Sequence, residues 1–259
     1  MRWMITGTSS GFGAALATVA RAAGHEVVAT TRAGGGDLHL DLRDPESIRA
    51  AAAAAGDVDV LVNNAGFGLL GAFEELTDAE LRDAFEVNLL GPLTLTRALL
   101  PGMRSRRFGR IVQLSSVVGV TSGPGGAAYA GPKAALEAAS VALAGEVRHL
   151  GIRVTIVQPG PFRTAFGGAG LRWSTPLPDY AEVIGPPRAA LEAGHGRQPN
   201  DPARGAAAIL AAVTRDEPPL HLPLGPEAFD WIREYFAERV NALSAVRPLG
   251  LDTAYRPAP

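Results

Sequence analysis

Residues 4–16, MITGTSSGFGAAL, join a short apolar run to an alanine-rich stretch through three closely spaced glycines, Gly7, Gly11 and Gly13. Glycine permits positive φ angles and close approach of the backbone to a ligand. A helix that starts at this turn presents free N–H groups and the positive end of its dipole, which together favour phosphate binding. Because the turn follows a strand pattern and opens a helix pattern, it predicts a dinucleotide site rather than an ordinary turn.

The same alternation of strand and helix patterns continues through the first two thirds of the chain. The predicted strands are RWMIT (2–6), EVVATT (26–31), LHLDL (38–42), DVLVNNAG (59–66), RIVQLSS (110–116) and IRVTIVQPG (152–160). Helical patterns lie at 11–24, 45–55, 78–100 and 127–149. Runs that are apolar throughout fit strands covered on both faces. The predicted fold class is therefore α/β, a Rossmann-type doubly wound, mostly parallel sheet of seven strands in a single domain, 1–259.

One connection in this pattern is unusually short. Only AGGGD (33–37) separates Arg32 from Leu38, whereas parallel neighbours normally need a dozen residues or a helix between them. Both strand patterns are clear, so we expect the connecting helix to be missing rather than one strand to be misassigned.

The last third of the chain has a different amino-acid composition. Residues 165–200 are rich in glycine and proline yet contain large apolar side chains such as Phe166, Leu177 and Tyr180. A disordered linker would be poorer in such groups, so we predict a mobile lid or loop that covers something apolar. A helix at 203–215, a short strand at 219–224 and a helix at 226–243 are expected to follow. The tail, 246–259, is compatible with an interface arm and with a frayed end.

Composition excludes several classes of function. With 47% hydrophobic and 19% charged residues and a net charge of −2, the chain gives no reason to expect nucleic acid or an anionic membrane as partner. It has no cysteine, which excludes disulfides and thiolate sites, and its five histidines form no H-x-x-x-H pair, so no metal site is expected. The sequence has neither a membrane-spanning run nor a signal peptide, and we expect a cytoplasmic location.

Tyr129 and Lys133 stand four residues apart in YAGPKAALEA (129–138). On a helix this spacing puts both side chains on one face, one turn apart. Lowering the pKa of a tyrosine from near 10 to about 7 requires roughly 4 kcal/mol of preference for the phenolate. A nearby ammonium in a partly desolvated cleft can supply much of this. Taken alone, the pair is equally compatible with a solvated helix surface.

A series of motifs, taken in order, decides between these readings. After T-G-x-x-x-G-x-G at the first turn come NNAG (63–66), VNLLG (87–91), QLSSVVG (113–119), YAGPK (129–133) and QPGPFRT (158–164). This series resembles the short-chain dehydrogenase/reductase family over nearly the whole chain. The resemblance implies an NAD(P)-dependent oxidoreductase of the carbonyl reductase or alcohol dehydrogenase type.

The resemblance also implies a catalytic tetrad of Asn88, Ser116, Tyr129 and Lys133. Tyr129 would exchange a proton with the substrate oxygen, and Lys133 would bind the nicotinamide ribose. Ser116 would hydrogen-bond the substrate oxygen, and Asn88 would hold a water that links Lys133 to solvent. The family usually has Ser or Thr before the lysine, where this chain has Pro132. Because proline is tolerated only in the first turn of a helix, we expect the helix to begin near Tyr129.

Further residues match cofactor-binding positions of the family. Among them Asp41 would contact adenine and Thr164 the carboxamide. The full predicted set is Gly7, Ser9, Ser10, Gly11, Phe12, Gly13, Arg32, Asp41, Leu42, Asn63, Ala65, Gly66, Tyr129, Lys133, Pro159, Gly160, Phe162 and Thr164.

The choice between NADP(H) and NAD(H) depends on the end of the second strand. An NAD-dependent enzyme would carry an acidic residue there, whereas this chain has Thr31 followed by Arg32, which can pair with a 2′-phosphate. Against this, Ser10 stands where many NADP-dependent members have a basic residue, and Asp37 is an alternative, acidic candidate for the ribose. We predict NADP(H), with NAD(H) as the alternative.

The predicted substrate wall is apolar. It comprises Val117, Val118, Phe162, Leu171 and Trp173, and no convergent arginines accompany it. We expect a neutral, fairly apolar ketone, aldehyde or alcohol as substrate. The C-terminal third is most similar to the hydroxysteroid- and retinol-dehydrogenase-like branch of the family, although similarity of loops is a weak guide to substrate.

Two other functions stay open at this point: a lyase, epimerase or dehydratase on the same fold, and a protein that binds NADP without catalysis. As partners we expect a small-molecule substrate and further copies of the chain, in a homodimer or homotetramer. Association would involve the helices at 78–100 and 127–149, the second of which is rich in small side chains. These are Ala134, Ala135, Ala138, Ala139 and Ala142, and packing against the subunit's own sheet is the alternative use for them.

Overall fold

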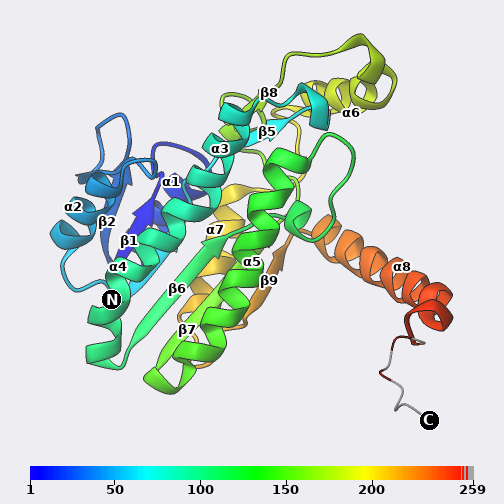
Figure 1. Cartoon of the computed structure of the whole chain (residues 1–259). Coiled ribbons are helices and arrows are strands. Elements are labelled where there is room, and N and C mark those ends of the chain that lie inside the picture. Colours follow the sequence, from blue (N-terminus) through cyan, green and yellow to red (C-terminus); the bar gives the residue numbers. More distant parts are fainter. Residues whose placement is uncertain (252, 254, 256–259) are drawn as a thin grey trace.

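The computed structural model describes residues 1–251, 253 and 255, which form a seven-stranded parallel sheet flanked by helices (Figure 1). The strands run in the order β3-β2-β1-β4-β6-β7-β9. They are β1 (Arg2–Thr6), β2 (Glu26–Thr31), β3 (Leu38–His39), β4 (Val60–Asn63), β6 (Gly109–Leu114), β7 (Ile152–Pro159) and β9 (His221–Leu224). The order reverses between β1 and β4, which opens a crevice at the carboxyl ends of these strands. The predicted fold class is confirmed.

Two apolar cores lie on opposite faces of this sheet. The covering helices are α1 (Gly11–Ala22) and α7 (Pro202–Val213) on one face, and α2 (Pro45–Ala55), α4 (Gly91–Arg106) and α5 (Ala127–Val147) on the other. Successive side chains of a strand point to opposite faces. Trp3 and Ile5 of β1 therefore pack with α1 and α7, whereas Met4 packs on the other side, and all three are fully buried.

The short connection after β2 lacks a helix, as predicted. β3 pairs with β2 over only two residues, Leu38 and His39, and not over the predicted five, 38–42. The reason is that Leu40 and Leu42 both turn into the core. The chain thereby leaves the sheet early and enters α2.

The segment 78–100, predicted as one helix, is divided into three elements. α3 (Asp78–Phe85) is followed by a wide π-type turn, η2 (Glu86–Leu90), and then by α4, which continues past Pro101 to Arg106. Met103, in the extension, is almost completely buried, and this burial offsets the hydrogen bond that Pro101 cannot donate. A π-type turn inside a helix is frequent at functional sites, and this one carries Asn88.

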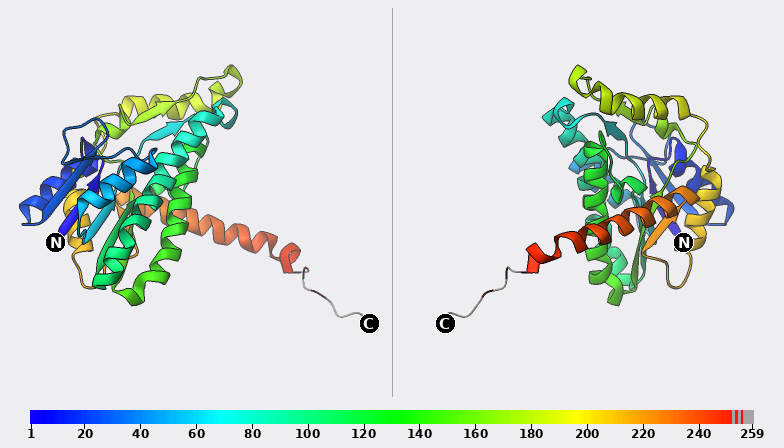
Figure 2. Two further views of the ribbon diagram at one scale, coloured as in Figure 1. Left: turned by 60° about the vertical axis from the view of Figure 1, so that its left-hand side comes forward. Right: turned by 90° about the vertical axis from the view of Figure 1, so that its right-hand side faces the viewer.

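The segment 165–200, predicted as a lid or loop, contains a strand and a helix that the sequence pattern did not indicate. β8 (Leu171–Trp173) pairs in parallel with β5 (Gly68–Leu70), and α6 (Ala181–Gly194) follows. The edge of β5, which the sequence reading missed, supplies hydrogen-bond partners that the segment lacks by itself. Figure 2 shows α6 and this small sheet lying beyond the carboxyl edge of the main sheet.

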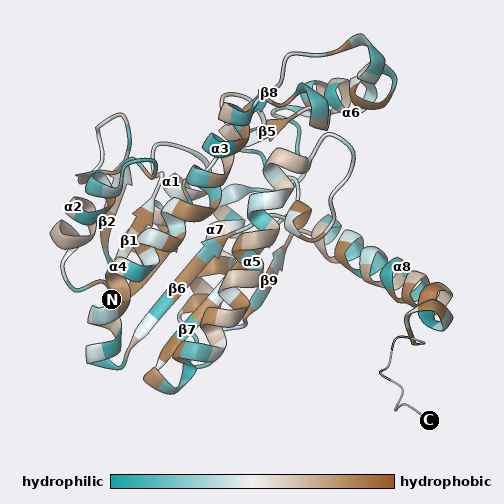
Figure 3. Cartoon of the chain, in the orientation of Figure 1, coloured by the Kyte–Doolittle hydropathy of each residue, from teal (hydrophilic) through white to brown (hydrophobic). Residues whose placement is uncertain are grey.

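The last helix, α8 (Pro226–Leu251), is eight residues longer than predicted and projects away from the body (Figures 1 and 3). It carries exposed apolar side chains, including Phe229, Phe236 and Leu243. Of the predicted tail, 246–251 belongs to α8, and 252, 254 and 256–259 lie outside the described residues. Within the described part of the chain, no helix is both long and apolar enough to cross a bilayer, and no three His, Asp or Glu side chains are grouped to hold a metal ion.

Candidate active site

The glycine turn between β1 and α1 is shaped by contacts that exclude side chains. Gly7 and Gly11 have positive φ angles of 70° and 59°. A Cβ on Gly13 would lie 2.3 Å from the carbonyl oxygen of Gly7, and one on Gly7 would lie 2.8 Å from Cα of Ala65. Gly7 N–H and Thr8 N–H both donate to the carbonyl of Thr30, which ties the turn to β2.

The loop after β4 clamps this turn from the other side. The Asn64 side chain donates to the carbonyls of Thr6 (2.8 Å) and Gly7 (3.1 Å). Thr6 Oγ1 accepts from the backbone N–H groups of Asn64 and Ala65, at 2.9 Å each. The sequence reading missed Asn64, although its position beside Asn63 in NNAG was the available signal. Ala65, predicted at the cofactor, lies against the turn.

Asn63, predicted at the cofactor, turns its side chain into the interior. Its Nδ2 donates to Thr96 Oγ1 (2.9 Å) and Gln113 Oε1 (3.0 Å), which join β4 to α4 and β6. Alternation along the strand explains the difference from Asn64, because neighbouring residues face opposite sides. The side chain of Asn63 therefore supports the sheet instead of facing the glycine turn.

The first turn of α1 fits the pyrophosphate of a dinucleotide. Ser10 precedes the helix without capping it through its side chain, so the first N–H groups stay available to phosphate oxygens. Ser9 and Ser10 are exposed beside them. Thr164 approaches from the end of β7, since a Cβ on Gly11 would lie 3.5 Å from Cβ of Thr164. The predicted contacts at the glycine turn and at Thr164 thus come together.

Phe12 and Phe162 serve packing with their side chains. Their ring centroids are 4.7 Å apart, and both rings press on Gly205 of α7, where a Cβ would come within 2.8 Å of each. Phe162 was also predicted in the substrate wall, but it is not among the residues that line the cavity described below. Pro159 and Gly160 end β7, and Gly160 N–H donates to the carbonyl of Leu224.

The end of β2 presents one charged side chain without a partner. Arg32 is exposed and makes no ion pair with any described residue. Asp37, the alternative candidate for the ribose, accepts from Ala29 N–H (2.7 Å) and from Arg21 (3.2 Å). Arg21 lies in the last turn of α1, about 15 Å along the helix from Gly11. The Asp37 carboxylate therefore lies near the C-terminal end of α1, away from the glycine turn.

Asp41 and Leu42, which follow shortly after β3, lie at the surface and in the core. Asp41 is partly exposed and accepts from Arg43 N–H (3.0 Å), so part of its carboxylate stays accessible. Leu42 is buried and packs against Gly91 at the start of α4. Only the backbone of Leu42 is therefore placed for the cofactor contact predicted for it.

The predicted tetrad is brought together at the carboxyl ends of β4 and β6. α5 begins at Ala127, two residues before Tyr129, so Pro132 is its sixth residue and not part of its first turn. Lys133 Nζ lies 5.9 Å from the centroid of the Tyr129 ring and donates to the carbonyl of Leu114 at 2.6 Å. The Ser116 hydroxyl lies near the Tyr129 phenol and lowers its pKa.

Asn88 closes the group from the π-type turn. Its Nδ2 donates to the carbonyls of Phe67 and Ala84 (3.0 Å each), and its Oδ1 accepts from Phe67 N–H (3.3 Å). A Cβ on Gly66 would lie 2.6 Å from Asn88 Oδ1 and 3.6 Å from Lys133 Nζ. Because Gly66 has no side chain, Asn88 and Lys133 can both lie close to its backbone.

Burial controls the protonation of the tyrosine–lysine pair. Desolvation raises the pKa of Tyr129 to about 12, against a smaller lowering by the Ser116 hydroxyl. Desolvation also lowers the pKa of Lys133 to about 8. The sequence reading expected the ammonium to lower the pKa of Tyr129, and in the chain by itself this expectation is wrong. The phenol is partly exposed in the crevice, but its surroundings are apolar and Lys133 directs its charge at Leu114.

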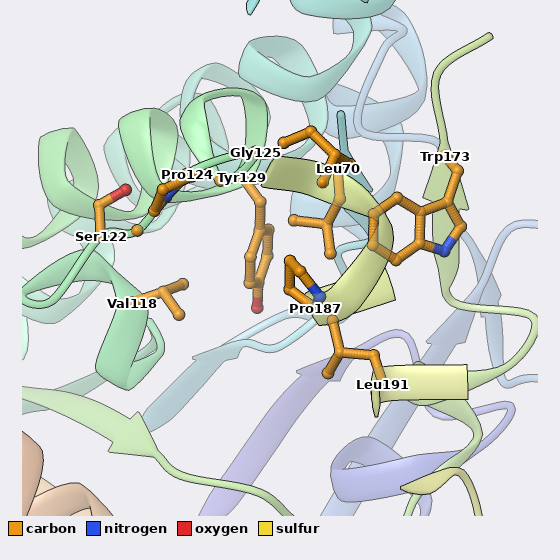
Figure 4. Close-up of a pocket in the computed structure, with 12 residues that line it drawn as sticks. Leu70, Val118, Ser122, Pro124, Gly125, Tyr129, Trp173, Pro187 and Leu191 are labelled. Atoms are coloured by element: carbon orange, nitrogen blue, oxygen red, sulfur yellow. The ribbon is translucent and has the colours of Figure 1, made fainter. Parts of the chain in front are cut away.

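A cavity of about 170 Å³ opens at the Tyr129 ring (Figure 4). The Tyr129 hydroxyl points between Val118 and Pro187. The lining residues come from β5, the short turn 117–119 after β6, the loop before α5, the start of α5, β8 and α6. They are Leu70, Val118, Ser122, Gly123, Pro124, Gly125, Gly126, Tyr129, Trp173, Ile184, Pro187 and Leu191.

Two of the predicted wall residues, Val118 and Trp173, line this cavity. Val117 is buried beneath it, and Leu171 packs on Gly68 of β5, so neither lines it. The sequence reading missed the α6 residues Ile184, Pro187 and Leu191, because it assigned no helix there.

Comparisons with known proteins agree with this geometry. The family model described as short chain dehydrogenase matches residues 2–173. Oxidoreductase BOA17 of Botryotinia fuckeliana is 32% identical over 261 residues, with 94% of each chain covered. The 3-ketodihydrosphingosine reductase of Bacteroides thetaiotaomicron is 35% identical over 237 residues, which cover 86% of this chain and 87% of the relative.

A solved structure agrees over almost the whole length. The crystal structure of a short-chain dehydrogenase from Streptomyces avermitilis is 44% identical, covers 98% of both chains and superposes with a TM-score of 0.91. The glycine turn, the crevice at the carboxyl edge and the tyrosine–lysine pair are therefore those of a member of the short-chain dehydrogenase family of oxidoreductases, to which this chain belongs.

Proposed function

We propose that this chain is an NADP(H)-dependent oxidoreductase that interconverts a neutral, apolar ketone or aldehyde and its alcohol, with Tyr129 as the general acid and base. The observation that carries the proposal is the cavity described above. Its lining is apolar except for Ser122 and Tyr129, and Tyr129 is its only titratable side chain. A carbonyl held there would have the phenol as its proton donor.

The side chains around Tyr129 supply the other roles. When bound, the nicotinamide cofactor supplies or accepts the hydride. The Ser116 hydroxyl, beside the phenol, would donate to the carbonyl oxygen as negative charge develops on it. Lys133, one turn from Tyr129, would bind the ribose and place a positive charge near the phenol. A phenol that holds its proton at neutral pH suits the direction of reduction.

The crevice supports NADP(H) through Arg32. This side chain is exposed and without an ion-pair partner among the described residues, and the nearby Asp37 is engaged elsewhere. A guanidinium can bind the 2′-phosphate through charge-assisted hydrogen bonds, each worth about 1.5–3 kcal/mol.

We expect Arg32→Ala to lower kcat/KM for NADPH by about 10–100-fold and to leave kcat/KM for NADH within about twofold, because only NADPH carries the 2′-phosphate. Steady-state rates with both cofactors measure this. Arg104→Ala is the matched control, since Arg104 is an exposed arginine at the far end of α4. A wild-type chain that prefers NADH would contradict the assignment.

The substrate proposal rests on the segment 165–200, which we infer to cover the substrate. Trp173, Ile184, Pro187 and Leu191 of this segment form one wall of the cavity. Arg188 lies over the Trp173 ring, 5.0 Å from its centroid, and bonds Glu192, so its charge has partners outside the cavity. The name of the Bacteroides relative is that of a reductase for a 3-keto compound.

A panel of carbonyl compounds tests both the reaction and its substrate class. We expect neutral apolar ketones or aldehydes to be reduced with consumption of one NADPH per product, and carboxylated analogues to react at least about tenfold more slowly, because burying an unpaired charge is costly. Product formed without loss of NADPH absorbance would indicate a lyase or epimerase instead. Turnover of charged substrates only would remove the apolar pocket from the proposal.

We further infer that the chain forms a homodimer or homotetramer through the helical segment 78–100, which comprises α3 and the start of α4, and through α5. Ala134, Ala138 and Ala142 of α5 are exposed, whereas Leu136 and Ser140 of the same helix are buried. The exposed alanines are thus not used against the subunit's own sheet and would let a second helix approach closely. Light scattering of the purified chain measures its mass in solution.

A further inference from the structure

Glu137 is a buried carboxylate one helical turn beyond Lys133. Glu137 is 9% exposed, and its two carboxylate oxygens accept hydrogen bonds from different residues. Oε1 accepts from Ser115 Oγ at 2.5 Å, and Oε2 accepts from Gln158 Nε2 at 2.9 Å. Both donors are neutral, and Glu137 is not within ion-pair distance of any cation among the described residues. The roles of the tetrad, as given above, make no use of it.

Lys133 is a buried cation that likewise has no charged group in direct contact within the part of the chain that the structure describes. It is 5% exposed, and its one hydrogen bond to the described chain goes to a neutral carbonyl, that of Leu114. An isolated buried ammonium or carboxylate is costly, and a buried charge is usually retained only with an opposite charge nearby. At a spacing of four residues on a helix, Lys133 and Glu137 lie on the same face as neighbours.

We propose that the Glu137 carboxylate is the buried counter-charge that keeps the Lys133 ammonium protonated beside Tyr129. Glu137 is then a positioning residue that acts through Lys133, and Ser115 and Gln158 hold its carboxylate in place. The significance of this for catalysis rests on the proposed function, whereas the charge pairing itself does not.

The charged surroundings of the pair agree with this assignment. Burial raises the pKa of Glu137, while hydrogen bonds from Ser115 and Gln158 and the charges of His221 and Lys133 lower it. Burial lowers the pKa of Lys133 to about 8, and the opposing influence is the charge of Glu137. Tyr129, the third titratable group on this face of α5, holds its proton in the same range and adds no charge.

The sequence offers a direct way to observe this pairing, because Lys133 is the only lysine in the chain. Protein grown on lysine labelled with ¹³C at Cε gives a single side-chain NMR signal, and its chemical shift follows the protonation of Lys133. We expect a midpoint near pH 8 for the wild type. In Glu137→Gln the midpoint should fall by about one pH unit, since the neutral amide retains the shape but removes the charge.

Three variants separate charge from shape. Glu137→Met is a second neutral replacement, for use if the glutamine variant fails to fold. Glu137→Asp keeps the charge and should titrate closer to the wild type than either neutral variant. Ser115→Ala removes the donor to Oε1 but leaves the charge and the hydrogen bond from Gln158 to Oε2, so its midpoint should stay within a few tenths of a pH unit of the wild type.

A midpoint unchanged in both neutral variants would overturn the proposal, since Glu137 would then be protonated or too distant to act. A shift in Ser115→Ala as large as that in Glu137→Gln would also overturn it, because local rearrangement would then explain both. The titration uses neither cofactor nor substrate. A shifted midpoint in a chain without carbonyl turnover would therefore support the pairing and reject only the proposed function.

In an active enzyme the same change should appear in the rates. The alkaline limb of kcat/KM should move to lower pH by about one unit in Glu137→Gln and not in Ser115→Ala. An alkaline limb that stays in place while the NMR midpoint moves would overturn the link between this pair and catalysis.

Discussion

Tyr129→Phe is expected to lower kcat for carbonyl reduction by about 10²–10⁴-fold, the usual contribution of general acid–base catalysis. The substitution removes only the hydroxyl that points into the cavity. The phenyl ring can keep its packing with Phe166, whose ring centroid is 5.3 Å away, so the wall of the cavity should be preserved. NADPH affinity, measured by fluorescence titration, should change by less than about tenfold, because one hydrogen bond is worth roughly 0.5–1.5 kcal/mol.

Tyr235→Phe is the matched control for this experiment. Tyr235 lies on α8, outside the cavity lining, and receives a hydrogen bond from Arg239, so the same chemical change there should leave kcat unaffected. Turnover retained in Tyr129→Phe would remove the proposed acid and base from the mechanism. Loss of NADPH binding together with turnover would instead indicate that the substitution disturbed the crevice.

Gly13→Ala is expected to abolish NADPH binding and to lower the free energy of unfolding by about 1–3 kcal/mol. The added Cβ would lie 2.3 Å from the carbonyl oxygen of Gly7 and 2.5 Å from Nδ2 of Asn64. Neither atom can move freely, because Asn64 Nδ2 donates to both Thr6 and Gly7. Relief of the clash must therefore displace the turn itself, and with it the N–H groups that face the phosphates.

Gly145→Ala is the matched control, because the same chemical change at this position should not destabilise the protein. Gly145 lies within α5, and a Cβ there meets no atom within 4 Å. Alanine is the better helix former by about 1 kcal/mol, so this variant should be as stable as the wild type or more so. Thermal and urea denaturation measure stability, and fluorescence measures NADPH binding. Wild-type binding by Gly13→Ala would show that the turn does not hold the cofactor.

The parts of this protein that could be predicted from the sequence depend on short stretches of chain. The glycine turn was predictable because positive φ angles and the strand–turn–helix order are local properties of residues 4–16. The alternation of strands and helices followed from apolar periodicity, and the approach of Tyr129 to Lys133 followed from helix geometry. The absence of a helix between β2 and β3 was predictable because the five residues that join these strands cannot form a helix of useful length.

The parts that needed the tertiary structure depend on partners distant in sequence. β8 forms only because β5, about a hundred residues earlier, offers an open edge, and α6 then brings Pro187 and Leu191 to the cavity. Asn63 and Asn64 are adjacent, but the sheet decided which of them meets the glycine turn.

The pKa of Tyr129 shows the difference most directly. The sequence placed an ammonium one turn away and so indicated a lower pKa, whereas burial raises it to about 12. Spacing along a helix determines which groups are neighbours, and it did so here for Tyr129, Lys133 and Glu137. Solvation depends on everything that the rest of the fold packs over those groups, and only the tertiary structure decided that.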